Sequence, residues 1–457
     1  MFQTVEMPVW VLVLLLAFAT VTFASHFLFP SVRWFFRRRL ERAVKKLNER
    51  LQRPIEPFKL ARRYDMIQRL IYDPEVSRAI ADHAKARGVP ENVAFERARS
   101  FAREIVPSFS AYAYFGVAIR LAKWVSQALY HVRLGHFDDE AMAGIDRDAT
   151  VVFVMNHRSN MDYVLVTWLA AERSALSYAV GEWARVWPLS LLIKAMGAFF
   201  IRRRERDRLY GRVLARYVGM ATDGGVTQAV FPEGRLSLDG APLTPRHGLI
   251  KHIVEERGRD ARDVVFVPVA LNYDRVFEDR LLIAAGRDGG RKFPARISVI
   301  ARFILWQAWL RLRGRYHRHG YAAVSFGVPM SLQAFQADHP GSDSRALTRA
   351  LMARIKAEVP VLPVPLVARA LLRADGPLDQ PALVARIGGM LDALSRTQSY
   401  VPESDPERAA RFGVGILRDR GLIEERSDGI AIVEAERPVL AYYAASIAHL
   451  FRDRSVD

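Results

Sequence analysis

His157 and Asp162 are an imidazole and a carboxylate five positions apart, and they follow the apolar run ATVVFVMN at 149–156. An aspartate within reach of an imidazole fixes the tautomer of the ring and stabilises its charged form. A histidine held in this way can take a proton from an alcohol. Because spacing alone does not establish contact between the two side chains, the pair predicts a general base only together with further motifs.

Two further segments place charged side chains at the ends of apolar runs. The run GAFFI at 197–201 ends in Arg202 and Arg203, and guanidinium groups are suited to bidentate binding of phosphate. In FPEGRLS at 231–237, Gly234 permits a tight turn between a glutamate and an arginine. Both segments therefore predict polar groups at the edge of a buried sheet.

A fourth apolar run, VFVPVA at 265–270, has Pro268 near its centre, which predicts an edge strand or a bulge. The order and spacing of the four segments resemble the glycerolipid acyltransferases, whose signature is four ordered blocks. The matching residues are, in block order, His157 with Asp162, Gly197 to Arg203, Phe231 to Ser237, and Val267 with Pro268. The resemblance covers roughly residues 146–332.

The resemblance implies an enzyme that transfers a fatty acyl group from an acyl thioester to a hydroxyl of a small phosphorylated acceptor. In such an enzyme His157 is the general base and Asp162 orients it. The residues that the resemblance assigns to substrate binding are Arg202, Arg203, Glu233, Gly234, Arg235, Ser237 and Pro268. A turn hydroxyl at Ser237 and a purely structural Pro268 are the open alternatives. No cofactor is implied, because the thioester is already activated.

Details of the blocks predict the acceptor. HRSNMDY at 157–163, GAFFIRR at 197–203 and the tail at 438–450 resemble the bacterial glycerol-3-phosphate acyltransferases, which implies acylation of the sn-1 hydroxyl of glycerol 3-phosphate to lysophosphatidate. FPEGR at 231–235 is nearer the lysophosphatidate enzymes. Lysophosphatidate, dihydroxyacetone phosphate or another lysophospholipid is therefore the alternative acceptor, and an inactive membrane-surface binding protein is the alternative of another class. Acyl-CoA and acyl carrier protein both stay open as donors.

The sequence lacks the residues that other classes of catalytic mechanism need. The chain has no cysteine, so thiolate catalysis, thiolate metal sites and disulfides are excluded. Ser159 lies next to the histidine but lacks the Gly-x-Ser-x-Gly elbow of a serine nucleophile. The sequence also contains no HExxH or comparable metal-binding spacing. Direct transfer between two bound substrates is the predicted mechanism.

The elements that position these residues follow from hydrophobic patterning. Short apolar runs suit buried strands and alternate with helical segments; the runs lie at 149–156, 226–234, 263–273 and 322–327. This alternation predicts an α/β fold, with a mixed, largely parallel sheet flanked by helices and with helical N- and C-terminal regions. The predicted division is an anchor at 1–30, a basic and helical region at 31–145, an acyltransferase domain at 146–335 and a helical region at 336–457.

The N-terminal segment predicts one transmembrane helix. Pro8–Pro30 contains no Asp, Glu, Lys or Arg and is long enough to cross a bilayer, which takes ~20 apolar residues. The basic stretch Arg33–Arg53 follows and stays cytoplasmic by the positive-inside rule. The predicted location is a bacterial-type inner membrane, crossed once, with the catalytic domain in the cytoplasm.

The formal net charge of +18 predicts anionic partners. We expect membrane lipids, the thioester donor and the phosphorylated acceptor, and no nucleic acid, since no recognised nucleic-acid-binding module accompanies the charge. Two apolar segments with cations have a second interpretation as bilayer contacts. For 109–134 core packing is the favoured interpretation, whereas for 301–316 a surface helix and a membrane contact are equally supported.

Overall fold

The computed structural model describes the chain at residues 8–11, 13–16, 42, 44–170, 174–181, 189–202, 207–258, 261–287, 319–395, 397 and 399–451. The chain divides into two compact units, Met1–Pro54 and Ile55–Asp457. In the first unit the described residues are helical at 9–11, 13–16, 42 and 44–48. Every element named below belongs to the second unit.

The predicted membrane segments are covered only in part. Most of Pro8–Pro30 and part of Arg33–Arg53 lie outside the described residues, and the segment 301–316 lies outside them entirely. Among the residues that are described, no helix is long and apolar enough to cross a membrane. The single-pass anchor therefore stays a prediction.

Eight strands of the second unit form one sheet, and two more form a hairpin. The strands are β1 (His131–Leu134), β2 (Thr150–Met155), β3 (Ser177–Gly181), β4 (Phe199–Ile201), β5 (Gln228–Val230), β6 (Val264–Tyr273), β7 (Tyr321–Phe326), β8 (Met330–Ser331), β9 (Ile423–Arg426) and β10 (Gly429–Ile432). The sheet order is β1-β7-β6-β2-β5-β3-β4, with β8 also paired to β6. The pairs of β6 with β7 and β8 are antiparallel, and the others in this sheet are parallel.

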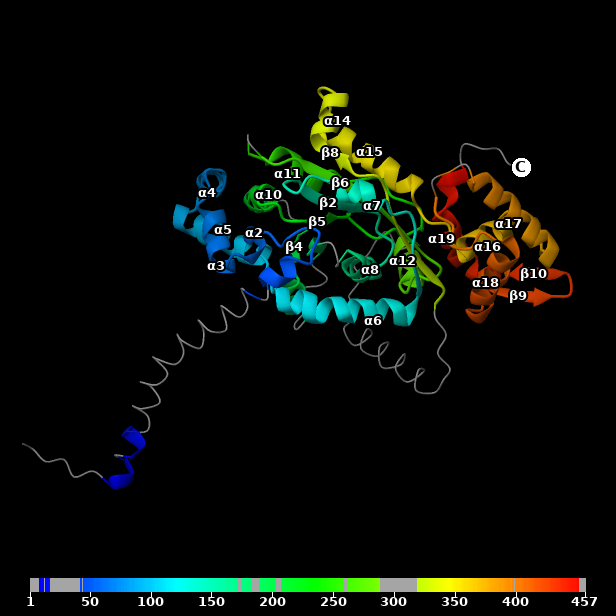
Figure 1. The fold of residues 1–457 in the computed structure, drawn as a ribbon, viewed down its shortest axis with the longest axis horizontal. Helices are drawn as coiled ribbons and strands as arrows, with labels where there is room; N and C mark the ends of the chain where they lie inside the picture. Colours follow the sequence, from blue (N-terminus) through cyan, green and yellow to red (C-terminus); the bar gives the residue numbers. More distant parts are fainter. Residues whose placement is uncertain are drawn as a thin grey trace, which may run out of the picture. The chain divides into compact units, whose positions relative to one another are not determined.

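Helices surround the sheet. They are α2 (Pro57–Leu60), α3 (Arg63–Ile71), α4 (Pro74–Arg87), α5 (Glu91–Ile105), the π-helix η1 (Tyr112–Ala118), α6 (Ile119–Leu129), α7 (Asp139–Ala143), α8 (Met161–Leu169), α9 (Leu189–Ala195), α10 (Arg208–Asp223), α11 (Gly248–Glu255), α12 (Asp279–Arg287), α14 (Leu332–Asp338), α15 (Ser344–Ala357), α16 (Pro363–Leu372), α17 (Gln380–Leu394), α18 (Pro406–Asp419), α19 (Arg437–Ala445), and the 3-10 turns η3 (Glu434–Glu436) and η4 (Ala448–Phe451). Figure 1 shows α6 and α8 on one side of the sheet and α11 and α15 on the other.

The central strands are apolar throughout because both of their faces are covered. In β2, Phe153 belongs to a core with α8, α12 and α16, whereas Val152 and Val154 belong to a core with α10, α11 and α15. Successive side chains of a strand point to opposite faces, so one unbroken apolar run supplies both cores. The predicted mixed, largely parallel sheet flanked by helices is confirmed.

Pro268 does not mark an edge strand or a bulge, and that prediction is wrong. The strand that contains it, β6, lies between β2 on one side and β7 and β8 on the other, with Pro268 opposite Val154. On the second side β8 pairs as far as Phe266 and β7 begins at Val269, so Pro268 falls where the partner changes. Its carbonyl accepts from Gly327 N–H at 2.8 Å. A central strand tolerates proline here because no ladder partner needs its missing N–H.

Candidate active site

The first and third blocks meet at the carboxyl ends of neighbouring parallel strands. β2 and β5 pair with Val154 opposite Val230, so the loops after both strands leave the same edge of the sheet. The ring of His157 stacks on that of Phe231, with 4.2 Å between centroids and 33° between planes. The Ser237 N–H donates to the His157 carbonyl oxygen at 3.3 Å. Two blocks that are far apart in the sequence thus form one site.

Asp162 is fully buried and receives four hydrogen bonds. One oxygen, Oδ2, lies 2.9 Å from Nδ1 of His157 and accepts the backbone N–H groups of Arg158 and Ser159 at 2.7 and 3.0 Å. The other, Oδ1, accepts the hydroxyl of Tyr273 at 2.7 Å. Burial, together with the charge of Asp162, raises the pKa of Tyr273 well above its usual value, so the tyrosine stays a donor. Both oxygens of this carboxyl group are therefore engaged in hydrogen bonds.

An ionised carboxylate only accepts hydrogen bonds, so the proton between His157 and Asp162 lies on Nδ1 of the ring. The second ring nitrogen, Nε2, then carries a lone pair and can accept a proton. The carboxylate would also stabilise the imidazolium that forms. The predicted contact between the two residues is present in the structure, with the geometry that a general base needs.

Two polar side chains hold the loop that carries this pair. Asn156 exchanges two hydrogen bonds with the backbone of Leu271, at 2.9 and 2.8 Å, and so ties the end of β2 to β6. Glu278 accepts the Ser159 hydroxyl at 2.9 Å and the backbone and side-chain N–H groups of Asn160 at 3.2 and 2.9 Å. The hydroxyl of Ser159 is thereby engaged in positioning the loop.

Glu233 of the third block is 2% exposed. Burial raises the pKa of its carboxyl group to about 8, although Arg158 and the backbone amides of Leu243 and His157 act in the opposite direction. Within the described part of the chain, its buried Oε1 atom has no hydrogen-bond partner. Gly234 follows with φ +67, a left-handed conformation that favours glycine. The turn therefore delivers a largely neutral carboxyl group to the interior of the site.

Ser237 is buried and its hydroxyl is occupied within its own turn. The Oγ atom lies 2.7 Å from the carbonyl oxygen of Ala241 and 3.1 Å from Oδ1 of Asp239. These contacts support the turn-hydroxyl alternative for this residue, and they leave its predicted role in substrate binding without a free hydrogen to donate.

The second block lies away from His157. Two strands, β5 and β3, separate β4 from β2 in the sheet. Arg202, directly after β4, forms a two-pronged ion pair with Glu104, at 2.9 and 2.8 Å, and its guanidinium lies 5.3 Å from the ring centroid of Phe101. Arg203 is outside the described residues. A role in binding phosphate stays a prediction for both arginines.

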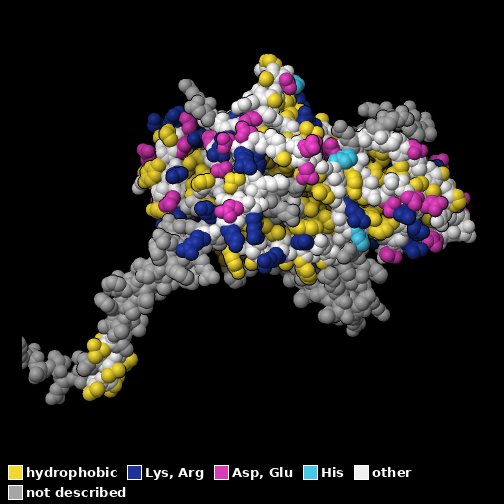
Figure 2. All heavy atoms as spheres, in the orientation of Figure 1, with side chains coloured by type: hydrophobic (Ala, Val, Ile, Leu, Met, Phe, Trp, Pro, Cys, Tyr) yellow, Lys and Arg dark blue, Asp and Glu magenta, His cyan; other side chains and the backbone are white. Residues whose placement is uncertain are grey.

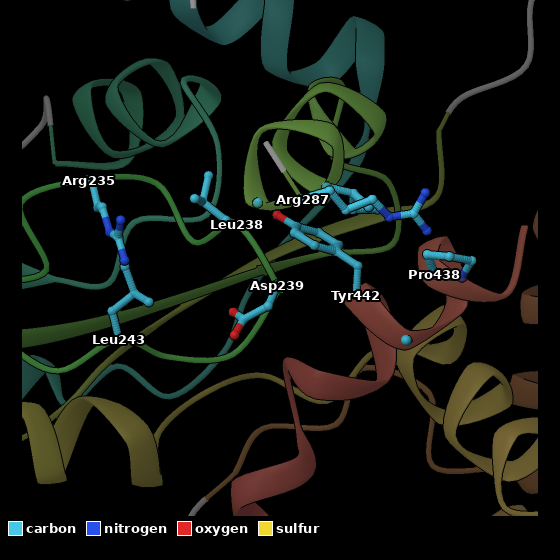
Figure 3. Close-up of a pocket in the computed structure, with 10 residues that line it drawn as sticks. Arg235, Leu238, Asp239, Leu243, Arg287, Pro438 and Tyr442 are labelled. Carbon is cyan, nitrogen blue, oxygen red and sulfur yellow. The ribbon is translucent and has the colours of Figure 1, made fainter. Parts of the chain in front are cut away.

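A cavity of about 430 Å³ lies between the third-block loop, α12 and α19. Figure 3 shows Arg235 and Arg287 at opposite sides of it, with Tyr442 of α19 between them. The lining residues are Arg235, Leu238, Asp239, Leu243, Ile283, Gly286, Arg287, Pro438, Ala441 and Tyr442. The C-terminal region thus supplies one wall of a space next to the third block.

The same region is fixed to the loop after β6 by a buried polar cluster. The Tyr443 hydroxyl donates to Asp279 at 2.6 Å and accepts the Val276 N–H at 3.0 Å. Arg420 donates to both the Asp279 carboxylate and the Tyr443 oxygen. A helix more than a hundred residues beyond the four blocks is therefore held in place as one wall of this cavity.

Comparisons with known proteins agree with this architecture. A family model described as acyltransferase matches residues 138–272, and one described as glycerol-3-phosphate acyltransferase C-terminal region matches residues 306–456. The predicted resemblance to the glycerolipid acyltransferases is confirmed by these two matches, which together span much of the chain.

Several curated glycerol-3-phosphate acyltransferases are similar to this chain over most of its length. The glycerol-3-phosphate acyltransferase of Pseudomonas putida KT2440 is 28% identical over 421 residues, which are 86% of this chain and 49% of that protein. The one of Pseudoalteromonas translucida is 26% identical over 422 residues, which are 86% of this chain and 50% of that protein. The chain spans about half the length of the curated relatives it matches. A 1-acyl-sn-glycerophosphate acyltransferase structure from Thermotoga maritima has a TM-score of 0.33 and 18% identity, covering 53% of this chain and 75% of that chain.

The structure adds four residues to the candidate site that the sequence did not predict: Arg158, Tyr273, Glu278 and Tyr442. Strand parity offered a signal for Tyr273, because Val269 and Leu271 share its side of β6 and belong to the core beside α8. The others depend on where loops bring their side chains, which the spacing of the motifs does not reveal.

Proposed function

We propose that the chain transfers a fatty acyl group from acyl-CoA or acyl carrier protein to the sn-1 hydroxyl of glycerol 3-phosphate, giving lysophosphatidate. The buried His157–Asp162 pair carries the proposal, because it leaves Nε2 as a base. The relatives named glycerol-3-phosphate acyltransferase support the choice of acceptor.

The reaction follows from this geometry. Nε2 of His157 takes the proton of the acceptor hydroxyl as the oxygen attacks the thioester carbonyl carbon. The carbon–sulfur bond of the tetrahedral intermediate then breaks, and the imidazolium returns the proton to the leaving thiolate. Asp162 stabilises the imidazolium between the two steps. The thioester supplies the activated acyl group, so the proposed steps use no cofactor.

Acceptor-dependent product formation tests the proposal. The full chain is incubated with labelled acyl-CoA or acyl carrier protein and with glycerol 3-phosphate, dihydroxyacetone phosphate or lysophosphatidate in turn. We expect lysophosphatidate from glycerol 3-phosphate. The variant His157→Ala should lose at least roughly 10³-fold in kcat. The control His339→Ala changes an exposed histidine elsewhere and should keep full activity. Product only from another acceptor would select an alternative. No product from any would favour an inactive binding protein.

We also propose that the larger unit works at an anionic bilayer surface through α6 and η1. Tyr112 and Trp124 are 74% and 55% exposed, and Leu121 is 48% exposed. Arg120 and Lys123 are exposed on the same helix, and residues 111–129 contain no Asp or Glu. Figure 2 shows Lys and Arg side chains beside apolar ones over α6. Exposed aromatic and aliphatic side chains with a cationic border match the interface of an anionic membrane.

This face has a direct relation to the active site. The opposite side of α6 packs against α8, the helix that carries Asp162, and η1 packs against α9, where Leu191 is 60% exposed. The core packing predicted for this segment therefore holds for one side of α6 only. A bilayer on the exposed side would lie one helix layer from the acyl-transfer site.

Because the chain has no cysteine, one introduced cysteine reports on one position. Leu121→Cys is labelled with an environment-sensitive fluorophore in the full chain and mixed with phosphatidylglycerol or phosphatidylcholine vesicles. We expect a blue shift with the anionic vesicles, reduced by Arg120→Gln and Lys123→Gln. The control is Val93→Cys on α5, 52% exposed, which should not shift. Equal responses at both positions, or none at 121, would contradict a role for α6.

A further inference from the structure

Arg158 is a buried arginine beside the general base whose donors are mostly unused. It is 3% exposed. Its Nη1 donates to the carbonyl oxygen of Gly240, and its guanidinium lies over the ring of Tyr442 at 5.0 Å from the centroid. Its Nε and Nη2 atoms are buried and have no hydrogen-bond partner among the residues that the structure describes. A guanidinium has five N–H donors, and burying several of them unpaired is unfavourable unless a ligand completes the set.

The charge around Arg158 is also unbalanced. Among the described residues, no carboxylate lies within 4.0 Å of its guanidinium. Burial raises the pKa of Glu233 to about 8 even though the charge of Arg158 acts in the opposite direction, so this carboxyl group is largely neutral at pH 7. The Oε1 atom of Glu233 and the hydroxyl of Tyr442 are also buried, and neither has a hydrogen-bond partner in the described ranges. We call Arg158, Glu233 and Tyr442 the open cluster.

The open cluster differs from the arginine that the sequence analysis favoured. The donors of Arg202 face Glu104 in a two-pronged ion pair, and its charge is therefore already balanced. The charge of Arg158 is not balanced in this way, although the residue directly follows the general base. A buried, uncompensated guanidinium with free donors is suited to a phosphate oxygen, which accepts bidentate hydrogen bonds from arginine.

We propose that Arg158 binds a phosphate group of a substrate, with Tyr442 of the C-terminal region beneath its guanidinium. The proposal rests on the proposed function, which supplies two phosphate-bearing substrates: the acceptor and the acyl donor. Glu233, as a neutral carboxylic acid, can donate to the same ligand or accept from its hydroxyl. The site joins the first block, the third block and the C-terminal helix α19 around one ligand.

Inorganic phosphate tests the site without activity. The full chain is titrated with phosphate, and its melting temperature and the heat of binding are measured for wild type, Arg158→Gln and Arg158→Lys. We expect a phosphate-dependent rise in melting temperature for wild type, a smaller one for Arg158→Lys and none for Arg158→Gln. The matched control is Arg369→Gln on α16, another buried arginine stacked on a ring, that of Phe451, at 4.6 Å. It should keep the phosphate response.

Steady-state kinetics identify the substrate that carries the phosphate. Loss of charge-assisted hydrogen bonds should raise one KM roughly 10- to 100-fold, with a smaller change in kcat. A higher KM for glycerol 3-phosphate assigns the acceptor, and a higher KM for acyl-CoA assigns the donor. An Arg158→Gln protein that melts earlier but responds to phosphate as wild type does would show a purely structural arginine. Phosphate binding that needs Arg158, in a chain inactive on every acceptor, would refute the proposed function and keep the site.

Discussion

Arg158 lies in the loop after β2 and Asp162 lies four residues later at the start of α8; both are almost completely buried, yet their hydrogen-bonding groups are in opposite states. Asp162 accepts four hydrogen bonds, from His157, two backbone amides and Tyr273. Among the described residues, two nitrogens of Arg158 and one oxygen of Glu233 have no hydrogen-bond partner. We call His157, Asp162 and Tyr273 the closed cluster, in contrast to the open cluster.

The contrast separates two tasks of a catalytic site. Groups that hold a base in one orientation are most effective when every bond is made in advance, because no reorganisation is then needed during reaction. Groups that recognise a substrate have unpaired donors and acceptors until it is bound, and such atoms are rare in folded proteins for other reasons. Substitutions in the closed cluster should therefore lower kcat, and those in the open cluster should change KM and pH dependence.

The largest expected effect is that of Asp162→Asn. An amide nitrogen in place of Oδ2 is itself a donor, and it would face the Nδ1 proton of His157 and two backbone N–H groups. The tautomer with the proton on Nδ1 would then no longer be favoured, and Nε2 would lose its role as the base. We expect kcat to fall by roughly 10³- to 10⁴-fold with the fold retained. Acyl transfer and circular dichroism are measured together, with the exposed Asp65→Asn as control. A loss below ten-fold would show that the closed cluster does not orient the base.

Glu233→Gln should change the pH dependence of stability. The pKa of this carboxyl group is raised from 4.5 to about 8 in the folded protein by burial, so the native state holds a proton that the unfolded chain releases in between. The contribution of this raised pKa to the free energy of unfolding is fully present below pH 4.5 and is lost as pH rises through about 8. From pH 5 to 9, wild type should lose roughly 2–4 kcal/mol more unfolding free energy than Glu233→Gln.

Urea unfolding at several pH values measures this difference. Asp274, whose pKa is raised to about 7 by burial, titrates in the same window in both proteins and cancels in the comparison. Parallel pH profiles for wild type and Glu233→Gln would mean that Glu233 is already ionised in the folded state. The open cluster would then be balanced in charge, and the case for an anionic ligand at Arg158 would be lost.

Tyr273→Phe removes one of the four bonds to Asp162 and no atom that meets a substrate. A hydrogen bond to a charged group contributes about 1.5–3 kcal/mol, so kcat should fall roughly ten-fold while KM stays within about two-fold. The matched control is Tyr130→Phe, a buried neighbour with 5.4 Å between ring centroids, whose hydroxyl donates to the neutral Arg275 carbonyl oxygen at 2.7 Å. It should lower stability by about 1 kcal/mol and leave kcat unchanged. Equal kinetics of the two variants would contradict a link from Tyr273 to the base.

Hydrophobic patterning in the sequence was sufficient to predict most of the sheet. The runs at 149–156, 263–273 and 322–327 became β2, β6 and β7, because buried strands need unbroken apolar sequence. β1 was missed, since its four residues HVRL continue a helical pattern and are ordered by pairing with β7. The hairpin β9–β10 inside the predicted helical C-terminal region was missed for the same reason, since the pairing of two four-residue strands defines it.

The chemistry of the site was predictable only where it is local in the sequence. His157 and Asp162 share one turn, so their spacing already limited their geometry. Tyr442 approaches Arg158 from nearly three hundred residues away, and no motif spacing encodes such a contact. Glu233 was predicted from its block, whereas its neutral state depends on burial by the assembled loops. Charge alone could not show which arginine is available to bind phosphate, because the tertiary structure decides which of them has a carboxylate partner.

The smallest expected effect on kinetics is that of Arg202→Gln, which is compared with Arg158→Gln. The Arg202 side chain is 30% exposed, but that of its partner Glu104 is only 7% exposed, so the substitution leaves a buried carboxylate and should lower stability by roughly 3 kcal/mol. The KM for glycerol 3-phosphate should change less than about three-fold, against the much larger change expected for Arg158→Gln. Glu104→Gln is the matched variant and should behave alike in both measurements. If Arg202→Gln instead raises the KM as strongly as Arg158→Gln, the ion pair with Glu104 must open to bind phosphate, and a paired arginine would be as much a substrate ligand as an unpaired one.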